Sequence, residues 1–485
     1  MIQEEAILAV LVGFLLWTQV NDLNSKLNSF EKFCLLILVI ALVLVCLMLW
    51  WQHFSKKGKE RKEEISKIEN IPDQLKSHES SVRLGDECDL EIPIFLSDSI
   101  RRRHVHLLGA TGSGKTESVI LNFIGQDIDR GVGSIILDAK GDISFIKYLQ
   151  GKVPASKLVI FDLSDSNSVP YNPLATGSAL EAAQRLFSSM TWSEEYYQSK
   201  ALSVLQQLFE FHRKRYEKNP TLCELCDYLQ SAQSFVAVCG DSINAKHAER
   251  EFGDLSGLRD QLRSLTVGHL GKLLNESKDG VDLNKAKEGY VIYFRLQSLL
   301  SPKAVGTLGR LIINHLNFLA GTAHREGGDA QLVPIYLDEF ASFACLEFAD
   351  LISKARSAGY ALHFSHQSIG DLTEVSPGFV NRIADNSATK IVMRINDPDS
   401  AEFFARSFGT KIFQKITQRI SGNADIQDGE LQGEGTVRDA HQFRASPDLF
   451  KTLPTGVGSV LIAHGFDSEE GASHVFKIRF PRLEV

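Results

Sequence analysis

The feature that most constrains the fold of this chain is a glycine-rich octapeptide at residues 109–116, which reads GATGSGKT. It matches the pattern G-x-x-x-x-G-K-[ST] in full, and it lies between a short apolar run at 104–108 and a helical pattern at 117–127. Glycines in such a loop let backbone N–H groups surround phosphate groups, and the N-terminus of the following helix adds partial positive charge. We therefore predict a phosphate-binding loop, or P-loop, between a strand and a helix.

The P-loop pattern predicts a role for its individual residues. Lys115 is expected to contact the β- and γ-phosphates of ATP and is therefore a predicted catalytic residue, while the Thr116 hydroxyl is expected to bind Mg²⁺. The residues expected to contact the bound nucleotide are Gly109, Ala110, Thr111, Gly112, Ser113, Gly114, Lys115, Thr116 and Glu117.

Two adjacent carboxylates indicate that the nucleotide is hydrolysed. The apolar run at 333–337 ends in Asp338 and Glu339. Asp338 is the expected partner of Mg²⁺, and Glu339 is the expected general base for the attacking water. An Asp-Glu pair at a strand end can also cap the next helix, but its combination with a P-loop favours catalysis.

A side-chain amide follows 28 residues after Glu339. The apolar run at 360–365 predicts another strand, and Gln367 comes shortly after it. An amide at that position can sense the γ-phosphate through a hydrogen bond. Gln367 is therefore a third predicted catalytic residue.

Short apolar runs alternate with helical patterns, which predicts an α/β fold with a doubly wound, mostly parallel sheet. Between 174 and 301 helical periodicity dominates and the only proline is Pro220, which predicts an all-helical domain inserted into that fold. Strands are expected at 104–108, 134–138, 158–163, 290–296, 332–338, 360–365, 388–394, 459–464 and 474–480. Helices of the insertion are expected at 179–190, 195–218, 221–230 and 257–274. The polar stretch at 417–438 is expected to form a long loop or a hairpin.

A stretch of nineteen residues at 33–51 carries no charge. As a helix it would be about 28 Å long, close to the hydrocarbon thickness of a bilayer, so it predicts a transmembrane helix. A second apolar segment at about 6–21 is shorter, and it is compatible with a tilted span or with an interfacial helix. Five Lys and Arg residues at 56–62 come shortly after the segment at 33–51. Because basic residues next to a transmembrane helix favour the cytoplasmic side, they place themselves and the rest of the chain in the cytoplasm.

These features divide the chain into five expected parts. They are a membrane anchor at 1–55, a juxtamembrane linker at 56–80, a first part of the nucleotide-binding domain at 81–175, the all-helical insertion at 176–285, and a second part of the nucleotide-binding domain at 286–485.

Composition excludes several other classes of protein. Apolar residues make up 44% and charged residues 23%, which excludes collagen-like and largely disordered chains. Seven scattered cysteines indicate a reducing compartment rather than a disulfide framework. Cys223 and Cys226 have a zinc-like spacing, but without a second ligand pair they are expected to be packed thiols. The net charge of −8 argues against a histone-like DNA coat, although it allows a local basic channel.

Together these motifs resemble those of the TraG/TraD family of type IV secretion coupling proteins. The segments that carry the resemblance are the two N-terminal apolar segments, RHVHLLGATGSGKTES at 103–118, DAKGD at 138–142, VPYNPL at 169–174, LDEF at 337–340 and SHQS at 365–368. The resemblance implies a RecA-like P-loop NTPase with an inserted all-helical domain, assembled as a hexameric ring. It places the protein in the bacterial inner membrane as a multi-pass protein with a cytoplasmic catalytic domain.

The resemblance also implies a function and partners. The protein would couple ATP hydrolysis, with Mg²⁺, to delivery of DNA into a type IV secretion or conjugation channel. The DNA would be single-stranded and carry an attached relaxase, and the partners would be relaxosome proteins and inner-membrane channel components. One departure from the family is the loop between the apolar segments, which is only about a dozen residues long and leaves little chain for contact with an outer scaffold.

Two other functions are compatible with the residues. One is a double-stranded DNA translocase of the FtsK/HerA type, which has a similar fold and is also tethered to a membrane. The other is a receptor for protein substrates of a type IV secretion system, in which ATP acts as a slow switch. The DAKGD and VPYNPL segments and the helical insertion favour the DNA-coupling function over the first of these.

A ring ATPase commonly completes its site with an arginine from the neighbouring subunit. Arg356 is predicted to be that catalytic residue because it follows Glu339 by 17 residues in a helical pattern that leads to the strand before Gln367. It is expected on the same face of the sheet as the carboxylates. The alternative is an arginine on the solvated C-terminal turn of a helix, which the helix dipole favours. Arg310 and Arg382 are further candidates.

Overall fold

The computed structural model describes residues 75–239, 252–275, 279–299, 301–327, 330–421, 430–463 and 473–482. The apolar segments predicted at 6–21 and 33–51 lie outside these residues. Within the described ranges, no helix combines the length and the apolar character needed to cross a bilayer.

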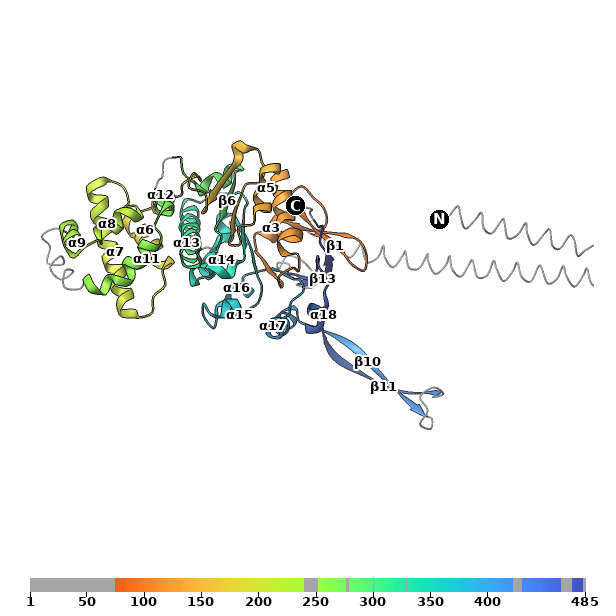
Figure 1. Ribbon diagram of the computed structural model, residues 1–485. Helices are drawn as coiled ribbons and strands as arrows, with labels where there is room; N and C mark the ends of the chain where they lie inside the picture. Colours follow the sequence, from red (N-terminus) through yellow and green to blue (C-terminus); the bar gives the residue numbers. More distant parts are fainter. Residues whose placement is uncertain are drawn as a thin grey trace, which may run out of the picture. The chain divides into compact units, whose positions relative to one another are not determined.

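Eleven strands of the described residues form one sheet in the order β2-β1-β13-β12-β9-β3-β8-β7-β4-β6-β5; Figure 1 shows this sheet with helices packed around it. The strands are β1 (Ser81–Glu87), β2 (Pro93–Ser97), β3 (Val105–Leu108), β4 (Ser134–Asp138), β5 (Leu158–Asp162), β6 (Val291–Arg295), β7 (Val333–Asp338), β8 (Tyr360–His366), β9 (Thr389–Val392), β12 (Val457–Ala463) and β13 (Ser473–Arg479).

The strands from β9 to β5 run parallel to one another, and the other pairs, including β9 with β12, are antiparallel. Every residue of β3, β4, β7 and β8 is buried. Parallel strands covered on both faces read as continuous apolar runs, and this is why the sequence revealed them. The predicted doubly wound, mostly parallel sheet is confirmed.

The helices that accompany the sheet follow its strands along the chain. They are α3 (Asp98–Arg101), the π-helix η2 (Lys115–Ile120), α4 (Leu121–Asp129), α5 (Ile143–Lys152), α13 (Pro302–Glu326), α14 (Leu346–Lys354), α15 (Gly370–Thr373), α16 (Phe379–Asp385), α17 (Pro398–Phe408) and α18 (Pro447–Thr452). Short 3₁₀ helices are η3 (Ala155–Lys157), η5 (Leu283–Glu288), η6 (Phe340–Phe343) and η7 (Ala355–Ala358).

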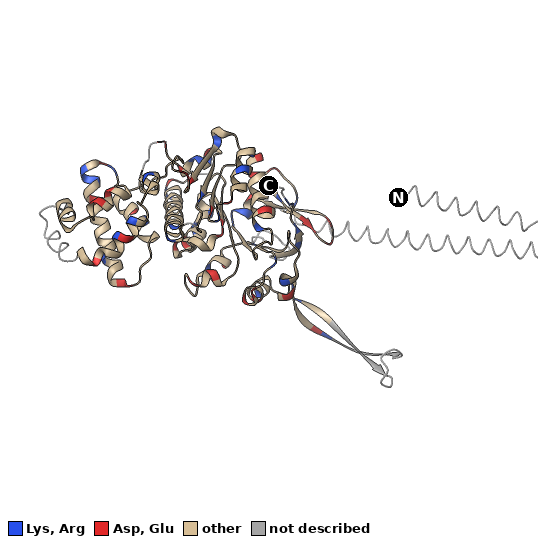
Figure 2. Ribbon diagram, viewed as in Figure 1, with Lys and Arg blue, Asp and Glu red and all other residues tan. Residues whose placement is uncertain are grey.

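Between β5 and β6 the described chain is helical. Its helices are α6 (Ala179–Ser189), α7 (Glu195–Tyr216), α8 (Leu222–Tyr228), α9 (Ala232–Cys239), the 3₁₀ helix η4 (Phe252–Leu255), α11 (Ser256–Ser264) and α12 (His269–Asn275). Capping boxes at Ser178 and Thr221 begin α6 and α8. Helix α6 packs against α13, which lies between these helices and the sheet. Charges of both signs are interspersed over them (Figure 2).

The local predictions differ from the structure in two places. Strands β1 and β2 were not predicted, because β2 is a five-residue run that begins with a proline and β1 contains three charged residues and Gly85. Gly85 is required there, since a Cβ atom would lie 2.4 Å from the Arg479 carbonyl oxygen of β13. The single helix predicted at 257–274 is wrong, because the chain breaks between α11 and α12 at Gly268, whose φ is +65°.

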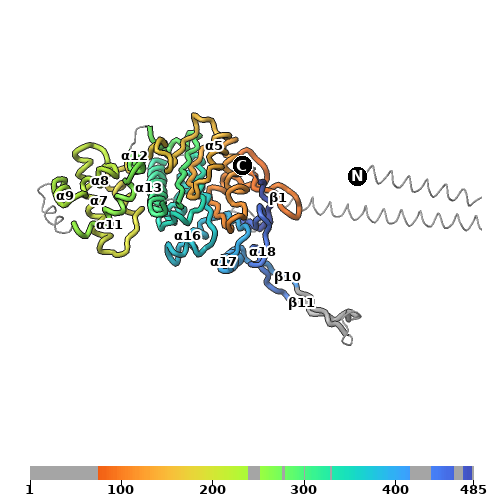
Figure 3. The backbone as a smooth tube through the Cα atoms, viewed as in Figure 1, coloured from red at the N-terminus to blue at the C-terminus, as the bar shows by residue number. Residues whose placement is uncertain are grey.

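The polar stretch near 417–438 belongs to a hairpin, one of its two predicted forms. Strands β10 (Thr410–Ser421) and β11 (Glu430–Phe443) pair antiparallel, with Thr410 opposite Phe443. Figure 3 shows the described start of this pair leading away from α17 and α18.

A buried ion pair connects α3 to the helix that follows the P-loop. Arg101, with no exposed surface, donates two hydrogen bonds to Asp127 at 2.8 and 2.7 Å and a third to the Tyr336 hydroxyl of β7 at 2.9 Å. Burial by itself raises the pKa of Asp127, but the Arg101 charge, together with hydrogen bonds from Arg101, Tyr336 and Arg130, holds the pKa below its ordinary value. The pair therefore stays charged at neutral pH and fixes α4 beneath the sheet.

We expect Asp127→Ala to lower the free energy of unfolding by about 3–5 kcal/mol, because among the described residues it leaves the buried Arg101 charge with only the longer ion pair to Asp98 at 3.2 Å. Denaturant titration of the detergent-solubilised chain measures this loss. The matched control is Asp129→Ala, which removes an exposed ion pair with Lys152 and should cost at most about 1 kcal/mol. Equal losses in the two variants would contradict the role given to the buried pair.

Candidate functional site

The P-loop is held in a shape that only glycine permits at several positions. Gly112 and Gly114 have φ values of +74° and +98°, in the left-handed region. A Cβ atom on Gly109 would lie 2.6 Å from the Ser113 hydroxyl oxygen. Backbone bonds tie the loop to the sheet, since Ala110 N donates to a carbonyl at the end of β9 and Ser113 O accepts from the loop before β12. The loop is therefore preorganised for phosphate.

Lys115 lies across this loop. Its Nζ donates to the Gly109 carbonyl oxygen at 2.6 Å, and only 6% of the residue is exposed. Burial lowers the pKa of the Lys115 ammonium, while the Glu339 and Asp338 carboxylates partly offset that effect. The ammonium therefore sits where phosphate oxygens can replace the carbonyl as its acceptor. The predicted helix after the loop begins as the π-helix η2 and becomes α-helical only at Leu121.

Asp338, at the end of β7, joins the P-loop to the neighbouring strand. The Thr116 hydroxyl donates to its Oδ2 at 2.7 Å, and the Ser365 hydroxyl of β8 donates to its Oδ1 at 2.5 Å. The Asp338 carboxylate is 2% exposed. The two predicted Mg²⁺ ligands, Thr116 and Asp338, thus lie in direct contact.

Glu339 and the P-loop are bridged by the predicted amide. Gln367 Nε2 donates to Glu339 Oε2 at 3.1 Å, and Gln367 Oε1 accepts from the Thr111 hydroxyl at 2.9 Å. The bridge exists because β8 lies between β3 and β7 in the sheet. Glu339 has φ +51°, a conformation that costs a non-glycine residue about 1–3 kcal/mol and marks functional sites. The structure therefore brings five predicted site residues together at the carboxyl ends of β3, β7 and β8, and we call this end of the sheet the P-loop edge. The residues are Lys115, Thr116, Asp338, Glu339 and Gln367.

A further buried carboxylate lies beside Asp338. Asp138 ends β4 and is the register partner of Asp338. It accepts from the Tyr293 hydroxyl at 2.7 Å and from the backbone N–H groups of Lys140 and Gly141 at 2.9 Å each. Burial, and then the Asp338 charge, raise the pKa of Asp138. Asp138 was not among the predicted site residues, although it ends an apolar run in the sequence in the same way as Asp338.

The arginines chosen from the sequence lie elsewhere. Arg356 is exposed in η7, directly before β8, whereas Gln367 directly follows β8. Within one subunit Arg356 therefore lies at the amino end of β8, whereas the carboxylates and Gln367 lie at the carboxyl ends of their strands, so the expected proximity of Arg356 to the carboxylates is wrong. Arg310 donates to the Ser189 carbonyl at 2.8 Å, and Arg382 pairs with Asp350 at 2.9 Å.

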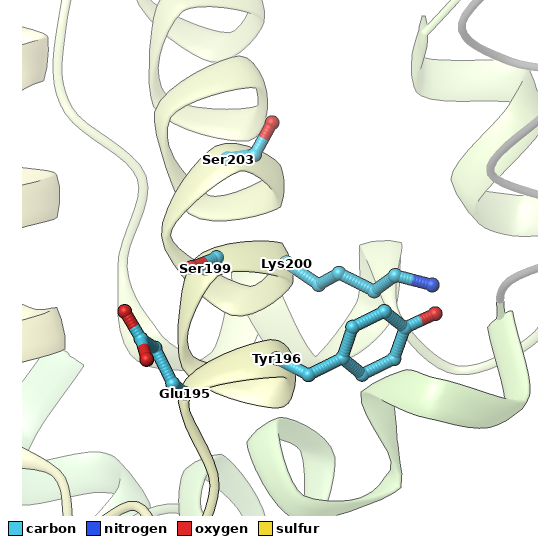
Figure 4. A pocket seen from close by; sticks show the side chains of 5 residues that line it. All are labelled: Glu195, Tyr196, Ser199, Lys200 and Ser203. Carbon is cyan, nitrogen blue, oxygen red and sulfur yellow. The ribbon is translucent and has the colours of Figure 1, made fainter.

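Two other features lie away from this edge. The thiols of Cys223 and Cys226 are partly buried on α8, with Cys226 Sγ 3.4 Å from the Thr266 hydroxyl. A surface hollow of about 500 Å³ lies along the start of α7 (Figure 4). All five of its lining residues come from that one helix, and Lys200 is paired with Asp254 at 2.6 Å. The hollow therefore lacks the converging groups of a nucleotide site.

Several solved structures share this fold. The bacterial conjugative coupling protein TrwBdeltaN70 matches with a TM-score of 0.62 over 85% of this chain and 90% of its own, at 15% identity. TrwB in complex with ADP and Mg²⁺ gives 0.61 over 84% and 91%, at 16% identity. VirB4 of Thermoanaerobacter pseudethanolicus gives 0.55 over 84% and 98%, at 14% identity. Together with the P-loop, these likenesses define the fold of this protein as the RecA-like α/β fold of P-loop NTPases.

Family models narrow this class. Residues 91–264 match the type IV secretion-system coupling protein DNA-binding domain, and residues 333–444 match the TraM recognition site of TraD and TraG. The type 4 coupling protein DotL of Legionella pneumophila is 24% identical over 191 residues, which is 36% of this chain and 22% of DotL, so the match spans about a fifth of that relative. The chain belongs to the type IV coupling proteins.

Proposed function

We propose that this protein hydrolyses ATP and couples hydrolysis to the delivery of DNA into a type IV secretion channel. The observation that carries the proposal is the connected set of Lys115, Thr116, Asp338, Glu339 and Gln367 on the P-loop edge. A loop that only cradled a nucleotide would need neither the carboxylate pair nor the amide that bridges it to the P-loop. TrwB, which shares the fold, is known in complex with ADP and Mg²⁺.

In this proposal each residue has one task. Lys115 exchanges its bond to the Gly109 carbonyl for phosphate oxygens, and Glu339 accepts a proton from the attacking water. Thr116 and Asp338 fit Mg²⁺, since they offer hard oxygen atoms in contact with each other. Bound Mg²⁺ would neutralise charge on the phosphates. Gln367 holds the Glu339 carboxylate in place.

The substrate is proposed to be single-stranded DNA with an attached relaxase. The match of residues 91–264 to a coupling-protein DNA-binding domain supports DNA, and the match of residues 333–444 to a TraM recognition site supports a relaxosome partner. Channel components of the inner membrane are the expected receivers.

The test is ATPase activity of the detergent-solubilised chain with single- and double-stranded DNA. We expect single-stranded DNA to stimulate turnover more strongly, and the stimulation to fall with added salt because phosphate contacts release counterions. Stronger stimulation by double-stranded DNA would favour an FtsK/HerA-type pump. Turnover that no DNA changes would favour the protein receptor with a slow ATP switch.

The domain plan and assembly follow the same proposal. Residues 1–55 would anchor the chain in the bacterial inner membrane through the segments at 6–21 and 33–51, and residues 56–80 would link them to a cytoplasmic motor. That motor would comprise the two nucleotide-binding parts, 81–175 and 286–485, with the helical insertion at 176–285. Confinement to a membrane raises effective concentration and would promote a hexameric ring.

Arg356 remains our proposal for the arginine supplied to a neighbouring subunit. Arg356 is exposed and lies at the amino end of β8, away from the P-loop of its own subunit. An arginine in that place can reach the site of another copy of the chain. We expect Arg356→Ala and Lys115→Ala chains to be inactive alone and to recover part of the activity when mixed, because some interfaces then pair an intact P-loop with an intact arginine. Parental activity of Arg356→Ala by itself would contradict the role, and Arg406→Ala, which removes an exposed arginine paired with Glu402, is the control.

A further inference from the structure

A buried histidine pair lies beneath the proposed catalytic edge. His106 of β3 and His366 of β8 have no exposed surface, and their Nε2 atoms are 2.6 Å apart. Phe364 and Phe404 flank the His106 ring at centroid distances of 4.6 and 5.4 Å. Two residues separate His106 from Gly109, the start of the P-loop, and His366 directly precedes Gln367. The pair therefore joins the strand of the P-loop to the strand of the bridging amide.

Hydrogen-bond partners assign the protons on both rings. His366 Nδ1 lies 2.8 Å from the Ser368 carbonyl oxygen, which can only accept, so Nδ1 carries a proton. In a neutral ring His366 Nε2 is then an acceptor, and His106 Nε2 must donate to it. His106 Nδ1 becomes the unprotonated nitrogen, and it is a buried atom without a partner among the described residues. Burial lowers the pKa of His366 to about 4 and that of His106 well below its ordinary value, so both rings are neutral.

The hydrogen bonds of His366 also fix the position of the turn that carries Gln367. The His366 ring reaches over Gln367 to the carbonyl of Ser368, so it closes the turn that carries the amide. The backbone on either side is also tied, since His366 O accepts from the Gly109 N–H at 3.3 Å and the Ile369 N–H donates to the Ser400 hydroxyl at 3.0 Å. Gln367 in turn spans Thr111 and Glu339.

We propose that His366, held in one tautomer by the Ser368 carbonyl and bonded to His106 through its other ring nitrogen, is a positioning residue that sets the Gln367 amide against Glu339. The inference rests on the proposed ATP hydrolysis. The alignment of the Glu339 carboxylate then depends on the buried contact between His106 of β3 and His366 of β8, and not on the P-loop alone. A neutral pair suits this task, because each ring then has one donor and one acceptor and the direction of the bonds is unique.

The test is a double-mutant cycle in the detergent-solubilised full chain, with kcat, KM and the Kd of a fluorescent ATP analogue as readouts. We expect His366→Leu to lower kcat by roughly 10- to 100-fold, the range for a catalytic group displaced by up to about 1 Å, with little change in Kd. His366→Asn should retain more activity, since its amide can still donate to the Ser368 carbonyl. In a Gln367→Ala background, His366→Leu should reduce kcat by less than about 2-fold further, because its effect passes through that amide.

The control is His315→Leu in α13, a buried histidine bonded to the Tyr171 and Thr176 hydroxyls. It should lower thermal stability without lowering kcat at permissive temperature. If His366→Leu does not fold, His106→Gln and His106→Leu provide the same cycle, since glutamine keeps a donor near the Nε2 position. Parental kcat in His366→Leu, or losses that simply add to those of Gln367→Ala, would overturn the inference while leaving ATP hydrolysis standing. A parental chain without ATPase activity would overturn the proposed function itself.

Discussion

Glu339→Gln should lower ATP turnover by about 10²- to 10⁴-fold while the nucleotide remains bound, the range for removal of a general base. Glutamine has nearly the shape of glutamate and can still accept the hydrogen bond from Gln367 Nε2, so the arrangement around Thr111 is kept. Its amide cannot take a proton from water. The unusual backbone conformation at position 339 favours neither residue over the other, so folding should be little affected.

Single-turnover ATPase assays and equilibrium binding of an ATP analogue separate the two effects. Glu374→Gln is the matched control, because it removes an exposed carboxylate on the turn after α15 and should leave turnover at the parental value. Parental turnover in Glu339→Gln would rule out Glu339 as the base. Loss of binding together with turnover would instead assign Glu339 to nucleotide affinity.

Lys115→Ala should lose both binding and turnover. A charge-assisted hydrogen bond contributes about 1.5–3 kcal/mol, so affinity for ATP should fall roughly 10- to 100-fold. The remaining carboxylates of Asp338 and Glu339 would then face the phosphates without the buried ammonium that offsets them. Turnover should fall below detection, because the charge that develops on the transferred phosphoryl group loses the P-loop ammonium.

Isothermal titration with ATP and Mg²⁺ measures the change in affinity, and circular dichroism checks the fold. Lys152→Ala is the matched control, because it deletes a lysine whose ion pair with the exposed Asp129 lies on the surface. Loss of that pair should change stability and ATP binding little. Unchanged affinity in Lys115→Ala would mean that the loop binds phosphate through its backbone N–H groups alone. Turnover close to the parental rate would remove Lys115 from the mechanism.

Features encoded by neighbouring residues could be predicted from the sequence alone. The glycines of 109–114 are demanded by backbone geometry, and the runs at 134–138, 333–338 and 360–365 are apolar because both faces of those strands are covered. The carboxylates and the amide were recognisable because they follow such runs. The prediction was poorest for β1, in which charged residues and a glycine interrupt the apolar pattern, and for β2, a strand of only five residues at the edge of the sheet.

Only the tertiary structure decided which strand ends meet. Strand order depends on pairing between residues hundreds of positions apart, as for β3 with β8, and no local pattern encodes it. The insertion of β8 between β3 and β7 is what lets Gln367 bridge Thr111 and Glu339, brings His106 against His366, and leaves Arg356 at the far edge. The sequence by itself determined the chemical groups and the strands that carry them, and long-range strand pairing determined which groups touch.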